Sequence, residues 1–320
     1  MIRFEHVSKE YPDGTKAVDD LHFTINKGEF FVLIGPSGCG KTTTLKMINR
    51  LIELSQGNIY IQEKNVSEYD IHSLRWNIGY VLQQIALFPH MTIAENIATV
   101  PELKKWRKSD INKRIDELLT MVGLDPKKFR ERKPEELSGG QQQRVGVIRA
   151  LAADPDIILM DEPFSALDPI SRQQLQDDLL TMKKHIHKTI IFVTHDIQEA
   201  FKLGDRICLM KDGTVVQIDT PEQIINHPAN EFVRRFLKTE NDTSSEWEEE
   251  LVERLLQWII PNPTPSYSLK TISTKEKLSA LLSILASDGE IAVEHDNKII
   301  GTVTSHTVIQ YLASLEEGRA

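Results

Sequence analysis

Cysteine and net positive charge are both scarce in this sequence. Only two of its 320 residues are cysteines, Cys39 and Cys208, so the chain cannot form the disulfide framework of a small secreted domain. Lysine and arginine number 38 against 47 aspartates and glutamates, which gives a net charge of -9. Proteins that bind nucleic acids need a basic face to neutralise the phosphates. The shortage of positive charge therefore argues against nucleic acid as a partner.

Long hydrophobic runs are also missing. No apolar run approaches the roughly 20 residues that span a bilayer, and Met1–Glu5 turn polar without the apolar core of a signal peptide. Hydrophobic residues make up 40% and charged residues 27% of the chain, which is usual for a globular protein. We therefore expect a cytosolic protein that works at a membrane only when another protein holds it there.

Short apolar runs are present instead, and they are typical of strands buried on both faces of a parallel sheet. The runs are Phe30–Ile34, Ile157–Met160 and Ile190–Val193. Each run is followed directly by residues with reactive groups. These are, in the same order, Gly35–Thr42, Asp161–Glu162 and Thr194–His195. Ligands in open α/β sheets bind at the carboxyl ends of the strands. The three endings therefore predict one shared site in an α/β fold.

The residues after the first run fit the pattern of a phosphate-binding loop. They are Gly35, Pro36, Ser37, Gly38, Cys39, Gly40, Lys41 and Thr42, with Thr43 following. Glycines let backbone N–H groups close around phosphate oxygens, and the next helix points its N-terminus at them. Lys41 is expected to reach the β- and γ-phosphates, and the Thr42 hydroxyl to bind Mg²⁺. Since Cys39 lies inside the loop, a bulky thiol reagent is expected to block hydrolysis and ATP to protect against it.

Two acidic residues follow the second run, as such a loop requires. Asp161 stands at the predicted strand end, where its carboxylate suits the hard cation Mg²⁺. Glu162 comes next and is placed to orient or deprotonate an attacking water. Together with the phosphate-binding loop, the pair predicts a nucleoside triphosphatase that uses Mg²⁺.

A further motif consists of Ser138, Gly139, Gly140 and Gln141, which we call the signature motif. In one interpretation it is a capping box, with Ser138 capping a helix and Gln141 reaching back to it. The two glycines add a second interpretation, since they allow backbone amides to approach an anion at a helix N-terminus. The two are compatible, because the cap would position the anion site.

With these motifs in order, residues 1 to about 238 resemble the nucleotide-binding subunits of ABC transporters. The resemblance implies a P-loop ATPase domain with a RecA-like core and a helical subdomain, here the charged stretch between Pro101 and Pro134. It also implies roles for further single residues: Tyr11 stacks on adenine, Gln83 links Mg²⁺ to the transmembrane partner, Asp168 lies in the dimer loop, and His195 contacts the γ-phosphate. Glu162, His195 and Gln83 are then the catalytic set.

The same resemblance implies the partners. The signature motif of one subunit contacts the ATP bound by the other, which implies a homodimer that closes on ATP. The segment Leu87–Asn96 resembles the part of importer ATPases that meets the permease. For any single residue of it, such as Phe88 or Met91, ordinary packing beneath the helical insertion is the alternative interpretation. Transmembrane permease subunits and an extracytoplasmic substrate-binding protein are therefore expected, with this chain peripheral on the cytoplasmic face of the cell membrane.

The C-terminal part narrows the type of transporter. Residues 239–265 combine an acidic helix with a proline-rich linker, and residues 266–320 resemble a small α+β CBS-like domain with a single motif. An ATPase with such a tail resembles the importers of glycine betaine, carnitine or choline. Thr307 stands where the family often has a ribose-binding aspartate, so a regulatory nucleotide and a purely structural dimer clamp both stay open. Other solutes, export of amphiphiles and a soluble regulator are the alternatives.

Overall fold

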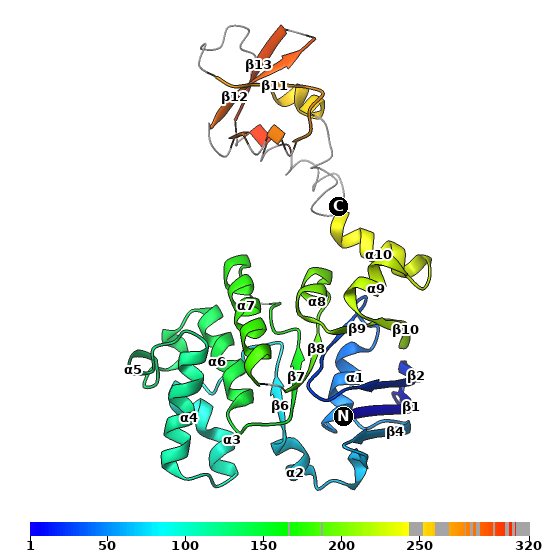
Figure 1. The fold of residues 1–320 in the computed structure, drawn as a ribbon, viewed down its shortest axis with the longest axis vertical. Helices are drawn as coiled ribbons and strands as arrows, with labels where there is room; N and C mark the ends of the chain where they lie inside the picture. Colours follow the sequence, from blue (N-terminus) through cyan, green and yellow to red (C-terminus); the bar gives the residue numbers. More distant parts are fainter. Residues whose placement is uncertain are drawn as a thin grey trace. The chain divides into compact units, whose positions relative to one another are not determined.

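The computed structural model divides into two compact units, Met1–Arg235 and Phe236–Ala320, both drawn in Figure 1. It describes residues 1–242 except 166 and 187, and then 252–259, 269–278, 280–281, 284–285, 289–296, 298–304, 307–308 and 311. The boundary predicted at residue 238 lies inside helix α10 (Glu231–Asp242), close to the division between the units. The acidic residues 243–251 and the proline-rich residues 260–268 lie outside the described part.

A six-stranded sheet forms the centre of the first unit, with strand order β10-β9-β3-β8-β7-β6. Its strands are β3 (Phe30–Ile34), β6 (Ile78–Val81), β7 (Ile157–Asp161), β8 (Thr189–Val193), β9 (Arg206–Lys211) and β10 (Thr214–Asp219). All neighbours pair in parallel except β10, which is antiparallel to β9. Every residue of β3, β7 and β8 is buried. The predicted parallel sheet, covered on both faces, is thus confirmed.

A second, antiparallel sheet packs beside the first in the order β2-β1-β4-β5. Its strands are β1 (Ile2–Glu10), β2 (Lys16–Ile25), β4 (Gln56–Ile61) and β5 (Lys64–Asn65). Phe23 of β2 stacks on Phe4 of β1 at 4.5 Å and on Phe31 of β3 at 5.6 Å between ring centroids. Aromatic pairs of this kind add to the stabilisation from burial. They join the two sheets into one core.

Helices cover the sheets and form a lobe at one side. The helices of this unit are α1 (Lys41–Ile48), α2 (Ile71–Trp76), α3 (Ile93–Leu103), α4 (Lys108–Met121), α5 (Pro126–Phe129), α6 (Gly139–Leu151), α7 (Pro169–Ile186), α8 (Ile197–Leu203) and α9 (Pro221–Asn226), with short 3-10 turns at Val66–Glu68 and Pro134–Glu136. Figure 1 shows α3 to α6 grouped beside the six-stranded sheet. Helices α4 and α5 lie within the stretch predicted as a helical subdomain, Pro101 to Pro134, whereas α3 and α6 extend the group beyond both ends of that stretch.

Helical spacing of apolar residues predicts a helix over Lys104–Gly123, and the apolar stripe is buried, but helix α4 starts only at Lys108. Ile111, Ile115, Leu118 and Leu119 all lie on the buried side of α4. The residues before Lys108 form a turn instead, because Lys105 has a φ of 56° and the Trp106 N–H donates to the Pro101 carbonyl. Helical spacing located the stripe correctly, and local turn geometry moved its start.

The second unit contains a three-stranded sheet in the order β11-β12-β13. Its described elements are β11 (Thr271–Ser273), β12 (Glu290–His295), β13 (Lys298–Thr304) and a 3-10 helix over Val252–Trp258. Strand β11 runs parallel to β12, and β13 runs antiparallel to it. The apolar pattern of the sequence predicts strands at Ile291–Val293 and at Ile299–Val303, where β12 and β13 lie, and the unit has its own apolar core. Its assignment as a CBS-like domain stays a prediction.

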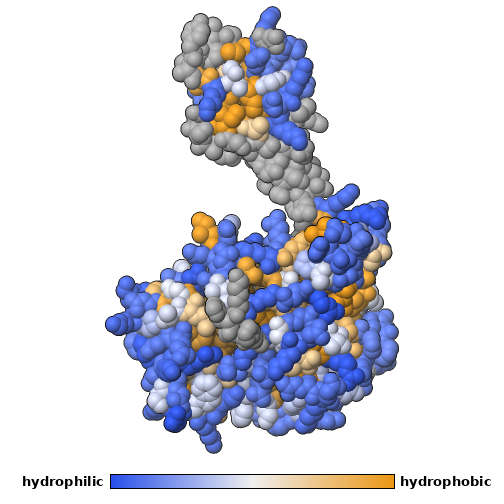
Figure 2. Space-filling view, in the orientation of Figure 1, coloured by the Kyte–Doolittle hydropathy of each residue, from blue (hydrophilic) through white to orange (hydrophobic). Residues whose placement is uncertain are grey.

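The surface of the first unit is mainly polar on the face shown in Figure 2. Leucine, isoleucine and valine side chains are concentrated in its buried core. Among the described residues, no helix is both long and apolar enough to cross a membrane.

Candidate active site

The loop between β3 and α1 has a shape that glycine alone permits at two positions. Gly40 adopts a φ of +99°, and a Cβ there would lie 2.5 Å from the Ala17 carbonyl oxygen. A Cβ on Gly35 would lie 2.2 Å from the Met210 carbonyl oxygen. Side chains cannot be accommodated at such distances from backbone atoms. The two glycines therefore let the loop pass between β2 and β9 and deliver the N-terminus of α1 to the strand end.

Lys41 is the first residue of α1, and its ammonium group turns back over this loop. Its Nζ donates to the Gly35 carbonyl at 2.7 Å and to the Pro36 carbonyl at 3.0 Å. The side chain is buried and makes no ion pair with another described residue, so a positive charge stands beside the amide groups of the helix N-terminus. Such a combination attracts phosphate.

The hydroxyl of Thr42 and the carboxylate of Asp161 meet directly below the loop. Thr42 Oγ1 donates to Asp161 Oδ1 at 2.8 Å, although the residues are far apart in the sequence. The Tyr80 hydroxyl donates to Asp161 Oδ2 at 3.3 Å, and burial together with this carboxylate raises the pKa of Tyr80 above its usual range. Hydroxyl and carboxylate oxygens are the ligands that Mg²⁺ prefers, so the donor set fits this ion. Sequence reasoning missed Tyr80, whose only signal is its strand position shortly before Gln83.

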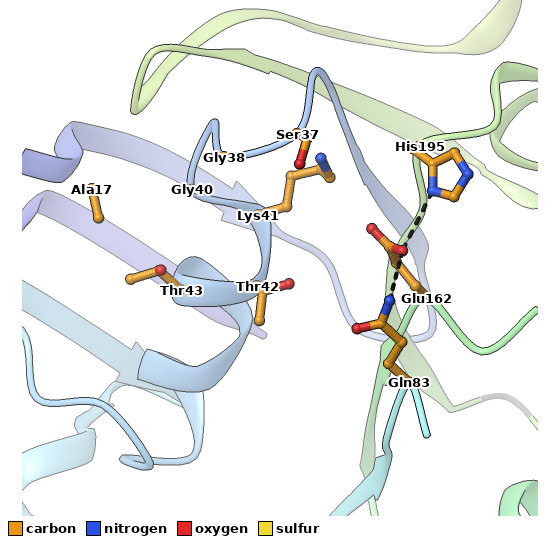
Figure 3. A pocket seen from close by; sticks show the side chains of 10 residues that line it. All are labelled: Ala17, Ser37, Gly38, Gly40, Lys41, Thr42, Thr43, Gln83, Glu162 and His195. Carbon is orange, nitrogen blue, oxygen red and sulfur yellow. Dashed lines mark hydrogen bonds and ion pairs between the residues drawn. The ribbon is translucent and has the colours of Figure 1, made fainter. Parts of the chain in front are cut away.

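Glu162 lies between Gln83 and His195, as Figure 3 shows. Gln83 Nε2 donates to Glu162 Oε2 at 3.2 Å, and His195 Nδ1 lies 3.4 Å from the same oxygen. Glu162 has a φ of 43°, which is unusual for a residue with a side chain. Its N–H donates to the Val193 carbonyl at 3.0 Å and helps to hold this conformation. Backbone strain of this kind is common at functional sites.

These groups surround one cavity of about 390 Å³, a volume suited to a small-molecule ligand. Its lining residues are Ala17, Ser37, Gly38, Gly40, Lys41, Thr42, Thr43, Gln83, Glu162 and His195, and Figure 3 shows them around it. The three predicted strand endings thus converge on one site. Ala17 of β2 was not predicted, because a single alanine in a strand carries no chemical signal in the sequence.

Other predicted residues lie away from the lining of this cavity. Tyr11 sits in the turn between β1 and β2, where its carbonyl accepts from the Gly14 N–H and the Lys9 ammonium lies 5.2 Å from the ring centroid. Asp168 precedes α7 and accepts from the Ser171 N–H at 3.0 Å. Hydrogen bonds with the Ser171 side chain and with its N–H lower the pKa of the Asp168 carboxyl. Within this chain, Asp168 is therefore a helix cap.

The signature motif also lies outside the lining, and it forms the capping box that the sequence suggests. Ser138 Oγ accepts from the Gln141 N–H, and the Gln141 side chain accepts from the Ser138 N–H. A Cβ on Gly140 would come within 2.7 Å of Ser171 Oγ on α7, whereas a Cβ on Gly139 would meet no atom of the described chain within 4 Å. Gly140 thus allows close helix packing, and Gly139 leaves its backbone open.

The Cys39 side chain is buried, which differs from the expectation that a thiol reagent reaches it. Its side chain belongs to the apolar core and is 3% exposed. Burial raises the pKa of the thiol, and the neighbouring Lys41 only partly offsets that effect. A buried thiol with a raised pKa is a poor nucleophile.

Comparison with known proteins places the chain in a family. Residues 18–165 match the family described as ABC transporter. The carnitine transport ATP-binding protein OpuCA of Listeria monocytogenes serotype 1/2a (strain 10403S) is 58% identical over 74% of this chain and 59% of its own length. The chain thus spans less than two thirds of that relative. The glycine betaine/carnitine/choline transport ATP-binding protein OpuCA of Bacillus subtilis (strain 168) is 48% identical over 97% of this chain and 80% of its own length.

A solved structure agrees with these relatives. The dimeric post-hydrolysis state of the ATP-binding cassette MJ0796, bound to ADP and Pi, is 37% identical with a TM-score of 0.62. The match covers 69% of this chain and 99% of that one. Fold, site geometry and sequence similarity lead to the same conclusion: the chain belongs to the ATP-binding proteins of ABC transporters.

Proposed function

We propose that this protein is the ATP-hydrolysing subunit of an ABC importer for quaternary-amine osmoprotectants such as glycine betaine, carnitine and choline. The observation that carries the proposal is the convergence of the phosphate-binding loop, the Thr42–Asp161 pair and the Gln83–Glu162–His195 group on one cavity. The names of the relatives support the solute class, since they describe carnitine transport and glycine betaine/carnitine/choline transport.

ATP binding follows from the loop and Lys41. The Lys41 ammonium now donates to two loop carbonyls, and phosphate oxygens are stronger acceptors that would draw it to the β- and γ-phosphates. Thr42, Asp161 and Gln83 would hold Mg²⁺, which neutralises charge on the phosphate oxygens when bound. The turn that contains Tyr11 would close over the adenine, beside Ala17.

Hydrolysis would depend on Glu162. Its carboxylate borders the cavity and is held by Gln83 and His195, so it can orient a water and accept its proton. General-base catalysis of this kind contributes about 10²–10⁴-fold to the rate. His195 is largely exposed, and its imidazole can contact a γ-phosphate once another protein surface covers the cavity.

A second subunit would provide that closure. Ser138, Gly139, Gly140 and Gln141 lie outside the lining of the cavity in their own chain, and Gly139 presents open backbone at the N-terminus of α6. A helix N-terminus with accessible amides suits an anion. We infer a homodimer in which the signature motif and the Asp168 loop of each subunit complete the site of the other. The dimeric relative structure supports this arrangement.

A groove beside the helical lobe would receive the permease. It measures about 430 Å³ and is mainly apolar; its lining residues are Trp76, Ile78, Gly79, Tyr80, Leu82, Ala86, Phe88, Thr99, Val100, Arg149, Ala150, Ala153 and Pro155. Trp76, Leu82 and Phe88 are exposed there, although large apolar side chains usually avoid water. An amphipathic helix of a membrane subunit fits such a groove. The chain would then be peripheral on the cytoplasmic face of the membrane.

The remaining partners are part of the same proposal. An importer of this kind takes its solute from an extracytoplasmic substrate-binding protein. The second unit would either bind a regulatory nucleotide or clamp the dimer. Its Thr307 is buried, with its Oγ1 3.1 Å from Thr304 Oγ1.

Substitution of Glu162 tests the enzymatic part. Glu162→Gln removes the base and keeps the side-chain shape, so we expect ATP binding to persist while turnover falls by about 10²–10⁴-fold. ATP should also convert the variant into a dimer of twice the 36.5 kDa subunit mass, which sedimentation would detect. Turnover equal to that of the wild type would contradict the assigned role.

Paired leucine substitutions test the membrane partner. Leu82 lines the groove, whereas Leu51 is similarly exposed outside it. We expect Leu82→Asp to abolish recovery of a polytopic permease from detergent-solubilised membranes and to abolish uptake of betaine, carnitine and choline. Leu51→Asp should preserve both. If the protein recovers a permease, but cells that lack the protein still take up betaine, carnitine and choline, the transported solute must be a different one.

A further inference from the structure

Glu199 is a buried carboxyl group beside the site that the mechanism above does not use. It belongs to α8, and only 5% of it is exposed. Thr194 Oγ1 donates to its Oε2 at 2.5 Å. Thr194 directly precedes His195 and is itself buried. The Glu199 carboxyl group is therefore hydrogen-bonded to Thr194, and the backbone of Thr194 helps to set the position of the His195 side chain.

The hydrogen bonds around Thr194 hold His195 from both sides. The Thr194 N–H donates to the Leu33 carbonyl of β3 at 3.2 Å. Its hydroxyl oxygen accepts from the Asp196 N–H at 3.0 Å while the hydroxyl proton points to Glu199. Asp196 Oδ1 in turn accepts from the Glu199 N–H at 3.1 Å. Loss of the Glu199 acceptor would free the hydroxyl to rotate and loosen this loop.

A second group approaches Glu199 from α7. Arg172 Nε lies 4.0 Å from Glu199 Oε1, and Arg172 Nη1 lies 4.0 Å from Asp196 Oδ2. Within the described residues, this Nε is buried and has no hydrogen-bond partner. A buried donor without an acceptor is costly, and a movement of about 1 Å would bring it into hydrogen-bond range of the carboxylate. Arg172 lies one helical turn after Asp168, which caps α7.

We propose that Glu199 is a positioning residue that fixes His195 through Thr194 and couples it to α7 through Arg172. The inference rests on the proposed ATPase function. It adds a route by which a partner subunit that touches the Asp168 loop adjusts the histidine of the same chain: α7 moves, Arg172 closes on Glu199, and the Thr194–Asp196 loop tightens.

The charge on Glu199 predicts a pH signature. The charged groups that face it are Arg172 from α7, Asp196 from the cap of α8 and His195 from the loop. Burial is the main cause that raises the pKa of Glu199 to about 7. The carboxylate accepts from Thr194 and attracts Arg172, whereas the protonated group attracts Arg172 far less. We therefore expect kcat to rise with pH through about 7.

Three variants test the inference in the full chain. Glu199→Gln keeps an acceptor for Thr194 but loses the charge, and Glu199→Ala loses both. Glu29→Gln is the matched control, because Glu29 is also buried and paired with an arginine, Arg206 at 3.1 Å, but lies at the opposite end of β3 from the phosphate-binding loop. The measurements are kcat and KM for ATP from pH 6 to 9, thermal stability, and amide hydrogen exchange of residues 194–199 without nucleotide.

We expect Glu199→Ala to lower kcat about tenfold or more, as a displaced catalytic group does, with KM for ATP changed less than twofold. In Glu199→Gln, kcat should no longer rise near pH 7. In Glu199→Ala, the backbone amides of residues 194–199 should exchange hydrogen faster than in the wild type. The inference would be overturned if Glu199→Gln had the same pH profile as the wild type. It would also be overturned if Glu199→Ala lowered kcat no more than Glu29→Gln does.

The exchange measurement separates this inference from the proposed function. If the wild type shows no ATP hydrolysis that depends on Glu162, the proposed function fails. Amide hydrogen exchange of residues 194–199 then decides by itself whether Glu199 is a positioning residue. Faster exchange in Glu199→Ala would then still support the positioning role, and unchanged exchange would reject it.

Discussion

At the scale of single residues, Glu199 makes the protein less stable than a neutral side chain would. Its pKa rises from an ordinary value of 4.5 to about 7 in the folded chain, so between these pH values the folded state binds more protons than the unfolded state. Stability therefore falls as pH rises through this window. Retention of a destabilising buried charge is typical of functional positions.

This cost predicts that Glu199→Gln gains stability relative to the wild type as the pH increases. Because one pKa unit corresponds to 1.36 kcal/mol, the gain from pH 4.5 to 8 should reach about 3 kcal/mol. Urea unfolding at both pH values measures it. A stability difference that stays the same at pH 4.5 and pH 8 would show that folding does not raise the pKa of Glu199.

Cys39 leads to a prediction about reactivity that reverses the expectation from sequence. The thiol is buried and its pKa is raised, so a thiol reagent should modify it at least about tenfold more slowly in the native protein than in urea. Cys39→Ala separates its signal from that of Cys208, which is also buried. Rapid labelling of native Cys39 would mean that the loop opens in solution.

At the scale of secondary-structure elements, the two glycines of the signature motif have different roles in the contact between α6 and α7. A Cβ on Gly140 would meet Ser171 Oγ at 2.7 Å and Ser171 Cβ at 2.9 Å. Gly140→Ala should therefore lower the free energy of unfolding by about 1–3 kcal/mol, the usual cost of overpacking. Gly139→Ala meets open space and should leave stability unchanged or slightly higher.

Combination of Gly140→Ala with Ser171→Gly provides the check on this helix contact. Removal of the serine side chain makes room for the new methyl group, so the double variant should be more stable than the sum of the two single effects. Urea denaturation of the wild type, the two single variants and the double variant measures the coupling. Additive effects would assign the loss in Gly140→Ala to another cause.

At the scale of the whole molecule, each unit has a separate apolar core. One core joins β1, β2, β3 and α1, and the other joins the strands of the second unit with Val252, Leu255 and Ile259. Every residue that lines the cavity belongs to the first unit. The residues that line the cavity thus pack in a different unit from the second apolar core.

Separate cores predict two thermal transitions, since a unit with its own core unfolds cooperatively by itself. A chain shortened to residues 1–242 should retain one transition at an unchanged temperature and hydrolyse ATP at a rate within about twofold of the full chain. Scanning calorimetry and an ATPase assay measure both. A single shared transition, or loss of the first one on shortening, would contradict independence.

The central strands, the phosphate-binding loop and the acidic pair Asp161–Glu162 at a strand end could all be predicted from local sequence patterns. These features have strong local signals: continuous apolar runs for β3, β7 and β8, and glycines at positions where a side chain would collide with Met210 or Ala17. The family could be identified for the same reason, because its motifs are short and ordered along the chain.

The way in which distant residues meet depends on tertiary packing. Parallel pairing of β7 with β8 and of β8 with β3 brings Glu162, His195 and Lys41 to one cavity, and no local pattern encodes that distance. The same packing turns Cys39 into the core, sets Gly140 against α7, and buries Glu199 under Thr194. Burial, and with it the pKa of a carboxyl or thiol, depends on neighbours from other elements, which a linear sequence does not specify.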